Sequence, residues 1–143
     1  MTVYALDTVG RHITTAKRLL VDLERYAETA VLAMSRQDDA EFFAALDVRE
    51  TLLGDLSTTI SALAHAHAWT SSADGEDPHR GMLTDVAHQA AAALEAQERL
   101  AIHCRNRRDE LAGAIRKIDA PDLVAHHYAA SGLSRRVTLS VTG

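Results

Sequence analysis

An apolar side chain recurs every three or four residues along the first part of the chain, and no other feature of the sequence constrains the fold as strongly. The steps alternate between four and three without a break, as they do where one helix packs at a shallow angle against others. The positions are Val9, Ile13, Ala16, Leu20, Leu23, Ala27, Ala30 and Met34. A pattern of this length predicts one long helix with a continuous seam like that of a coiled coil.

We call such a row of regularly spaced, mostly apolar residues a ladder, and two further ladders with the same spacing follow. The second consists of Phe42, Leu46, Arg49, Leu53, Leu56, Ile60, Leu63 and His67. The third consists of Leu83, Val86, Ala90, Ala93, Gln97, Leu100, Cys104, Arg107, Leu111, Ala114 and Ile118. We predict about 28 residues for each of the first two helices and about 35–41 for the third, at a rise of ~1.5 Å per residue. Pro121 ends the third helix, because the residue before a proline is pushed out of the helical region.

The predicted fold is therefore all-α: an antiparallel bundle of three long helices with a short C-terminal helical segment and tail. A chain of 143 residues is one domain by length. Within it, residues 1–120 form the long-helix bundle, and residues 121–143 form a short amphipathic segment and a flexible tail. The Ser-, Asp- and Gly-rich stretch at residues 70–80 reads as a loop. Asp38 is placed to cap the second helix, with Glu41 as its reciprocal partner.

Charge and cysteine usage limit the class of protein. The net charge of −5, from 20 acidic and 15 basic residues, argues against a nucleic-acid partner, which favours a basic face. A single cysteine, Cys104, rules out an internal disulfide and fits a reducing compartment. The first residues contain no apolar signal segment, and no apolar run reaches the ~20 residues that a membrane span needs. We expect a cytoplasmic protein without a membrane span.

Catalytic and metal-binding patterns are poorly matched. Helical di-metal bundles use paired Glu-x-x-His motifs, and the nearest match, Asp85 with His88, occurs once among eight histidines. His103 precedes Cys104, but adjacent helical residues diverge by ~100°, so the imidazole is poorly aimed to activate the thiol. We expect no enzyme activity, no cofactor and no metal. A histidine-based metal-binding bundle is the weaker alternative.

Two arginines occupy seam positions that are otherwise mostly apolar. Arg49 and Arg107 are predicted to pack their stems on the seam while the guanidinium groups stay in water. The alternative for either is an ion pair that sets the helix register, with a glutamate such as Glu24 or Glu98.

The predicted third helix is longer than its neighbours. In an up-down-up bundle its C-terminal part would extend roughly 10–20 Å beyond them. That part still carries Leu111, Ile115 and Ile118, and an apolar stripe without a neighbour is a binding surface until it is covered. Leu123, Val124 and Tyr128 in the short segment that follows are candidates to cover it, and another chain is the alternative.

Several stretches resemble the FlgN/FliT type of flagellar type III export chaperone. The segment "LERYAETAVLAMSRQDDAEFFAALDVRETLLGDL", from Leu23 to Leu56, has that family's long helix, short polar turn and second helix with an Arg-Glu pair, here Arg49-Glu50. The segment "NRRDELAGAI", from Asn106 to Ile115, resembles the family's late polar-then-apolar helix. The ending, with Tyr128 and Gly132, is similar as well, so that the resemblance covers most of the chain.

The resemblance implies a cytoplasmic chaperone or adaptor without a cofactor. Such proteins hold the helical C-terminal region of a secreted filament or hook-associated subunit, and they also meet the export apparatus. The family places cargo binding in its C-terminal amphipathic region, and the positions that match are Leu111, Ile115, Ile118, Leu123 and Tyr128. The main alternative is a self-assembling helical structural protein, in which the overshooting third helix makes a homodimer.

Overall fold

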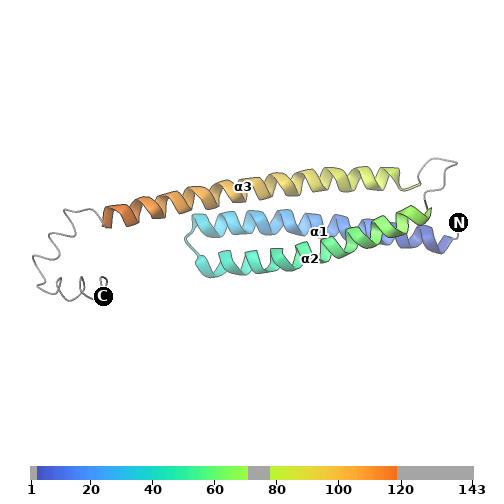
Figure 1. Ribbon diagram of the computed structural model, residues 1–143, viewed down its shortest axis with the longest axis horizontal. Helices are drawn as coiled ribbons and strands as arrows, with labels where there is room; N and C mark the ends of the chain where they lie inside the picture. The colour runs from blue at the N-terminus through green and yellow to red at the C-terminus, as the bar shows by residue number, and fades with distance from the viewer. Residues whose placement is uncertain (1–2, 71–77, 119–143) are drawn as a thin grey trace, which may run out of the picture. The chain divides into compact units, whose positions relative to one another are not determined.

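The computed structural model describes residues 3–70 and 78–118, and all of these residues except 36–38, 78 and 79 lie in helices. The helices are α1 (Val3–Ser35), α2 (Asp39–Thr70) and α3 (Arg80–Ile118) (Figure 1). Within those ranges there is no strand. The predicted all-α fold with three long helices is confirmed. The short C-terminal segment and most of the 70–80 loop lie outside the described residues.

The first two helices are longer than their ladders predicted, at 33 and 32 residues, and α3 has 39. A ladder marks only the packed part of a helix, and backbone hydrogen bonds carry the helix beyond its last packed residue. The chain divides into two compact units, Met1–His103 and Cys104–Gly143, and α3 contributes to both. The predicted boundary after residue 120 lies outside the described residues and stays a prediction.

A Schellman turn joins α1 to α2, which lie side by side in Figure 1. Gln37 has a φ of 58°, in the left-handed region that usually takes glycine. Its N–H donates to the Met34 carbonyl oxygen at 3.1 Å, and the Asp38 N–H donates to that of Ala33 at 2.9 Å. Asp38 then caps α2 as predicted, because its Oδ1 accepts the Glu41 N–H at 3.0 Å. The predicted reciprocal hydrogen bond, from the Asp38 N–H to the Glu41 side chain, is not made, because that N–H already donates to the Ala33 carbonyl oxygen.

His79 starts α3 and ties it to the beginning of α1. Its carbonyl oxygen accepts the Leu83 N–H at 2.9 Å, which is the first hydrogen bond of the helix. Its buried ring places Nε2 3.2 Å from the Leu6 carbonyl oxygen. The start of α3 is therefore fixed by the His79 side chain, a residue that the sequence places in the predicted loop at residues 70–80.

The core of the unit Met1–His103 is centred on α1. Seven of the eight ladder positions of α1 are buried, and Met34 is half-buried. The main cluster joins four α1 residues to one residue each from α2 and α3: Ala16, Leu19, Leu20, Leu23, Leu56 and Ala93. Alanine is frequent in this core, which lets the backbones of α1 and α2 approach closely.

Six of the eight ladder positions predicted for α2 are buried or half-buried, and two are exposed. Arg49 and Leu56 are buried, but Leu53 and Ile60 are 51% and 50% exposed. Ala45 is buried in their place. Apolar residues occur on more than one side of α2, and packing against α1 selects the side that carries Ala45, Arg49 and Leu56.

Candidate protein-binding site

Three large aliphatic residues near the end of α3 are exposed on one side of the helix. Leu111, Ile115 and Ile118 expose 48%, 58% and 68% of their surface. Their spacing of four and then three residues places them in one row, which we call the α3 stripe. Leu123 and Tyr128, the other two predicted site residues, lie outside the described residues.

The α3 stripe has the sequence pattern of a packed helix. Ala93, Ala96 and Leu100 are buried at spacings of three and four residues. The same spacings recur at Leu111, Ala114 and Ile118, all of which are exposed. The side chains are therefore arranged to pack against a helix, since this pattern does so in the core of the same protein.

Positive charge surrounds the α3 stripe. Residues 104–118 contain five basic residues, Arg105, Arg107, Arg108, Arg116 and Lys117, and two acidic residues, Asp109 and Glu110, so their net charge is 5 − 2 = +3. Arg108 lies three residues before Leu111 and therefore on the same side of the helix. The segment presents an apolar row with cations beside it.

Arg107 and Arg108 each meet a nearby acid. Arg107 Nη1 lies 3.2 Å from Glu110 Oε2, and Arg108 Nη2 lies 3.3 Å from Asp109 Oδ1. All four side chains are at least 40% exposed, so these pairs are screened by water and contribute little to stability. The solvated position predicted for the Arg107 guanidinium agrees with this geometry.

Arg49 behaves differently, and both interpretations offered for it are wrong. It is only 6% exposed, and its guanidinium donates hydrogen bonds to the backbone carbonyl oxygen of Leu23 and to Oε1 of Gln97. Neither water nor a glutamate is its main partner, and Glu24 instead accepts a hydrogen bond from Gln89 at 2.7 Å. Burial lowers the pKa of the Arg49 guanidinium below its ordinary value. Arg49 therefore joins α1, α2 and α3 and belongs to the core.

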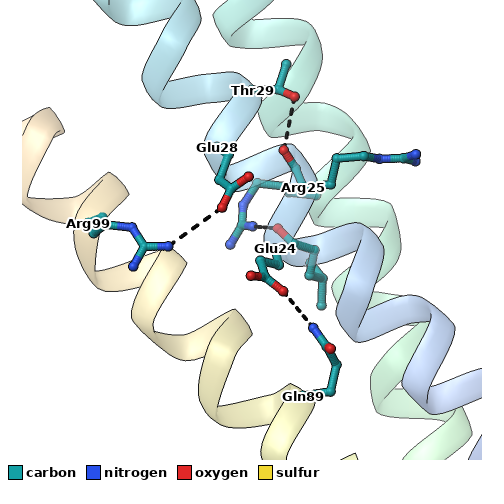
Figure 2. Close-up of polar contacts among 8 residues, drawn as sticks. Glu24, Arg25, Glu28, Thr29, Gln89 and Arg99 are labelled. Atoms are coloured by element: carbon teal, nitrogen blue, oxygen red, sulfur yellow. Dashed lines mark hydrogen bonds and ion pairs between the residues drawn. The ribbon is translucent and has the colours of Figure 1, made fainter.

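An apolar groove lies between α1 and α3 within the unit Met1–His103, with a volume of about 290 Å³. We call it the α1/α3 groove, and it is lined by Glu28, Val31 and Leu32 from α1 and by Ala96, Arg99 and His103 from α3. Figure 2 shows Glu28 reaching toward Arg99 across the two helices, with Glu28 Oε1 3.8 Å from Arg99 Nη2. Beside this pair, the figure shows Gln89 on α3 donating to Glu24 on α1.

Sequence reasoning missed the groove, although one signal points to it. Val21 and Leu32 are exposed aliphatic residues that do not belong to the α1 ladder. They are 32 − 21 = 11 residues apart, or about three turns, so they share a side of α1. A second apolar row on a helix that already has a core seam indicates a second packing surface.

Nucleophilic and metal-binding chemistry has little support in residues 3–70 and 78–118. Cys104 is half-buried, and burial raises the pKa of its thiol, which disfavours the nucleophilic thiolate. Over these ranges no group of three His, Cys, Asp or Glu side chains is placed to hold a metal ion. None of the helices that the structure describes combines the length and the hydrophobicity required to cross a membrane.

Comparison with models of protein families, with curated proteins and with solved structures finds no match to this chain.

Proposed function

We propose that this protein is an adaptor that binds an amphipathic helix of a partner protein along the α3 stripe. The observation that carries the proposal is the exposure of Leu111, Ile115 and Ile118 in one row. A contiguous exposed apolar row with charged residues beside it is the usual mark of a protein interface. Helices that recognise such a row place their own aliphatic residues at steps of three and four.

The resemblance to FlgN/FliT-type export chaperones supplies the class of partner. We propose that the partner is the helical C-terminal region of a secreted filament or hook-associated subunit, held in the cytoplasm before export. The resemblance in Asn106–Ile115 includes part of the α3 stripe, which supports this assignment. In this proposal Leu123 and Tyr128 extend the binding surface, and the protein acts by binding, without catalysis.

The test measures binding to peptides from the C-terminal helices of the filament and hook-associated subunits of the same genome. Titration calorimetry should give a saturable complex with at least one peptide. Ile115→Asp should weaken it by at least about tenfold, or ~1.4 kcal/mol, because it places a charge in the apolar row. Leu53→Asp is the matched control, since Leu53 is about as exposed but lies on α2.

Circular dichroism should show unchanged helix content for both variants, because both positions are exposed. If Ile115→Asp binds as tightly as the unmodified protein, the α3 stripe is not the binding surface. If no subunit peptide binds, the export role is rejected.

A further inference from the structure

We infer that the free protein forms a dimer in which residues 104–118 of one copy lie in the α1/α3 groove of a second copy. Both surfaces are present on every chain, and within residues 3–70 and 78–118 neither is covered, since Leu32, Leu111 and Ile115 are 53%, 48% and 58% exposed. The inference does not depend on the identity of any export cargo, so it stands or falls separately from the proposed function.

Opposite charges favour this pairing. Residues 1–103 contain 16 acidic and 8 basic residues, so their net charge is 8 − 16 = −8. Residues 104–118 have a net charge of 5 − 2 = +3. Opposite net charges steer two surfaces together and fix their orientation. The α3 stripe of one copy is therefore attracted to the acidic unit of another copy, whereas two stripes repel each other.

The α1/α3 groove and the α3 stripe both present aliphatic side chains. Val31, Leu32 and Ala96 are the apolar residues that line the α1/α3 groove, and the α3 stripe offers leucine and isoleucine side chains. A cavity of roughly 150 Å³ holds a benzene molecule, so a groove of about 290 Å³ has room for branched aliphatic side chains. Ile102 and Val21 are further exposed aliphatic residues on the same two helices.

Residues 104–118 can reach an α1/α3 groove only on a second chain. An α-helix is a rod that rises 1.5 Å per residue, and a segment of a rod does not fold into a groove lined by an earlier part of that rod. Ala96, Arg99 and His103 of the groove and the residues of the α3 stripe belong to the same helix. A second copy meets this requirement and supplies the complementary charge.

Twofold symmetry makes the contact large enough to be stable. Residues 104–118 are about 22 Å long at 1.5 Å per residue, so a single stripe-in-groove contact is small. In a twofold dimer each copy both offers its stripe and receives one, so the contact is made twice. Making the contact twice doubles the buried surface, and specific dimers bury roughly 1,200–2,000 Å² in total.

The experiment measures the mass of the full chain by sedimentation equilibrium, from low micromolar to several hundred micromolar, at low and high salt. We expect a dimer whose dissociation constant rises with salt, because the pairing is partly electrostatic. Ile115→Asp in the stripe and Leu32→Asp in the groove should each weaken the dimer by at least tenfold. Arg108→Glu combined with Arg116→Glu should weaken it without changing an apolar residue. Leu53→Asp should leave the dimer unchanged.

Mixing the two apolar variants gives the sharpest result. The Ile115→Asp chain keeps an intact groove, and the Leu32→Asp chain keeps an intact stripe, so the mixture restores one of the two contacts. A mixed dimer should therefore form more tightly than either variant forms with itself. Contact of stripe with stripe, or of groove with groove, predicts no such rescue.

Three outcomes would overturn the inference: a monomer at every concentration, a dimer that Leu32→Asp leaves intact, or no rescue on mixing. Leu32 is 53% exposed, so its substitution should keep the fold, and circular dichroism checks this. Leu32→Asp should bind a cargo peptide at least as tightly as the unmodified chain, because its stripe is no longer covered. That measurement separates a failure of the dimer from a failure of the proposed function.

Discussion

The guanidinium of Arg49 on α2 donates a hydrogen bond to the backbone carbonyl oxygen of Leu23, in the middle of α1. The same group also donates to the Gln97 side chain on α3. One buried cation thus joins three helices, and its hydrogen-bond partners are neutral.

Replacement of Arg49 should separate the contribution of its hydrogen bonds from that of its packing. Arg49→Ala removes the stem and leaves the Gln97 amide without its partner, and it should lower the free energy of unfolding by about 2–4 kcal/mol. Arg49→Met keeps an unbranched stem and avoids the burial of a charge, so it should cost about 1 kcal/mol or less. Urea unfolding followed by circular dichroism measures both values. Equal losses for the two variants would show that the hydrogen bonds of the guanidinium, which both variants lack, outweigh the packing of the stem.

Two leucines of α2, three residues apart, should differ sharply in their effect on stability. Leu56 is buried in the core cluster, whereas Leu53 is 51% exposed. Leu56→Ala should cost about 2–5 kcal/mol, as the loss of buried leucine side chains does, and Leu53→Ala should cost roughly 0.5 kcal/mol or less. Leu20→Ala in α1 should behave like Leu56→Ala. Equal thermal shifts for Leu53 and Leu56 would contradict the orientation of α2.

Gln37 holds a backbone conformation that glycine adopts without strain. Its φ of 58° lies in the left-handed region, where a β-carbon is unfavourable. Gln37→Gly should raise the free energy of unfolding by about 0.5–1 kcal/mol, and Gln37→Val should lower it, because a branched β-carbon adds strain. Chemical denaturation of the three proteins gives the order. Equal stability for Gly and Val would mean that the turn does not retain this geometry.

The thiol of Cys104 should titrate at a higher pH in the folded protein than in the unfolded chain. Burial raises its pKa, and only the thiolate reacts with alkylating agents. The pH midpoint of the iodoacetamide reaction should therefore be higher in buffer than in denaturant. By linkage, the stabilisation from the protonated thiol is complete below the unfolded-state pKa and is lost as the pH rises through the folded-state pKa. Cys104→Ala should remove this pH dependence, and coincident midpoints would show that the thiol is solvated.

The sequence by itself determined the elements of this fold. The uninterrupted spacing from Val9 to Met34 can be satisfied only by a helix with one apolar side, and that property is local to each segment. The cap at Asp38 is local too, because its side chain bonds to a backbone group three residues away. The row of Leu111, Ile115 and Ile118 also followed from spacing alone, although spacing does not say what covers it.

The tertiary structure alone decided which surfaces meet. α2 has apolar residues on more than one side, so the burial of Leu56 and the exposure of Leu53 depend on how α2 is rotated against α1. Arg49 meets Gln97, which is 97 − 49 = 48 residues further along the chain, and no periodicity encodes that partner. The α1/α3 groove likewise combines Leu32 with Ala96. Helical periodicity records which side of a single helix is apolar, whereas the rotation of one helix against another is set by the joint packing of all three.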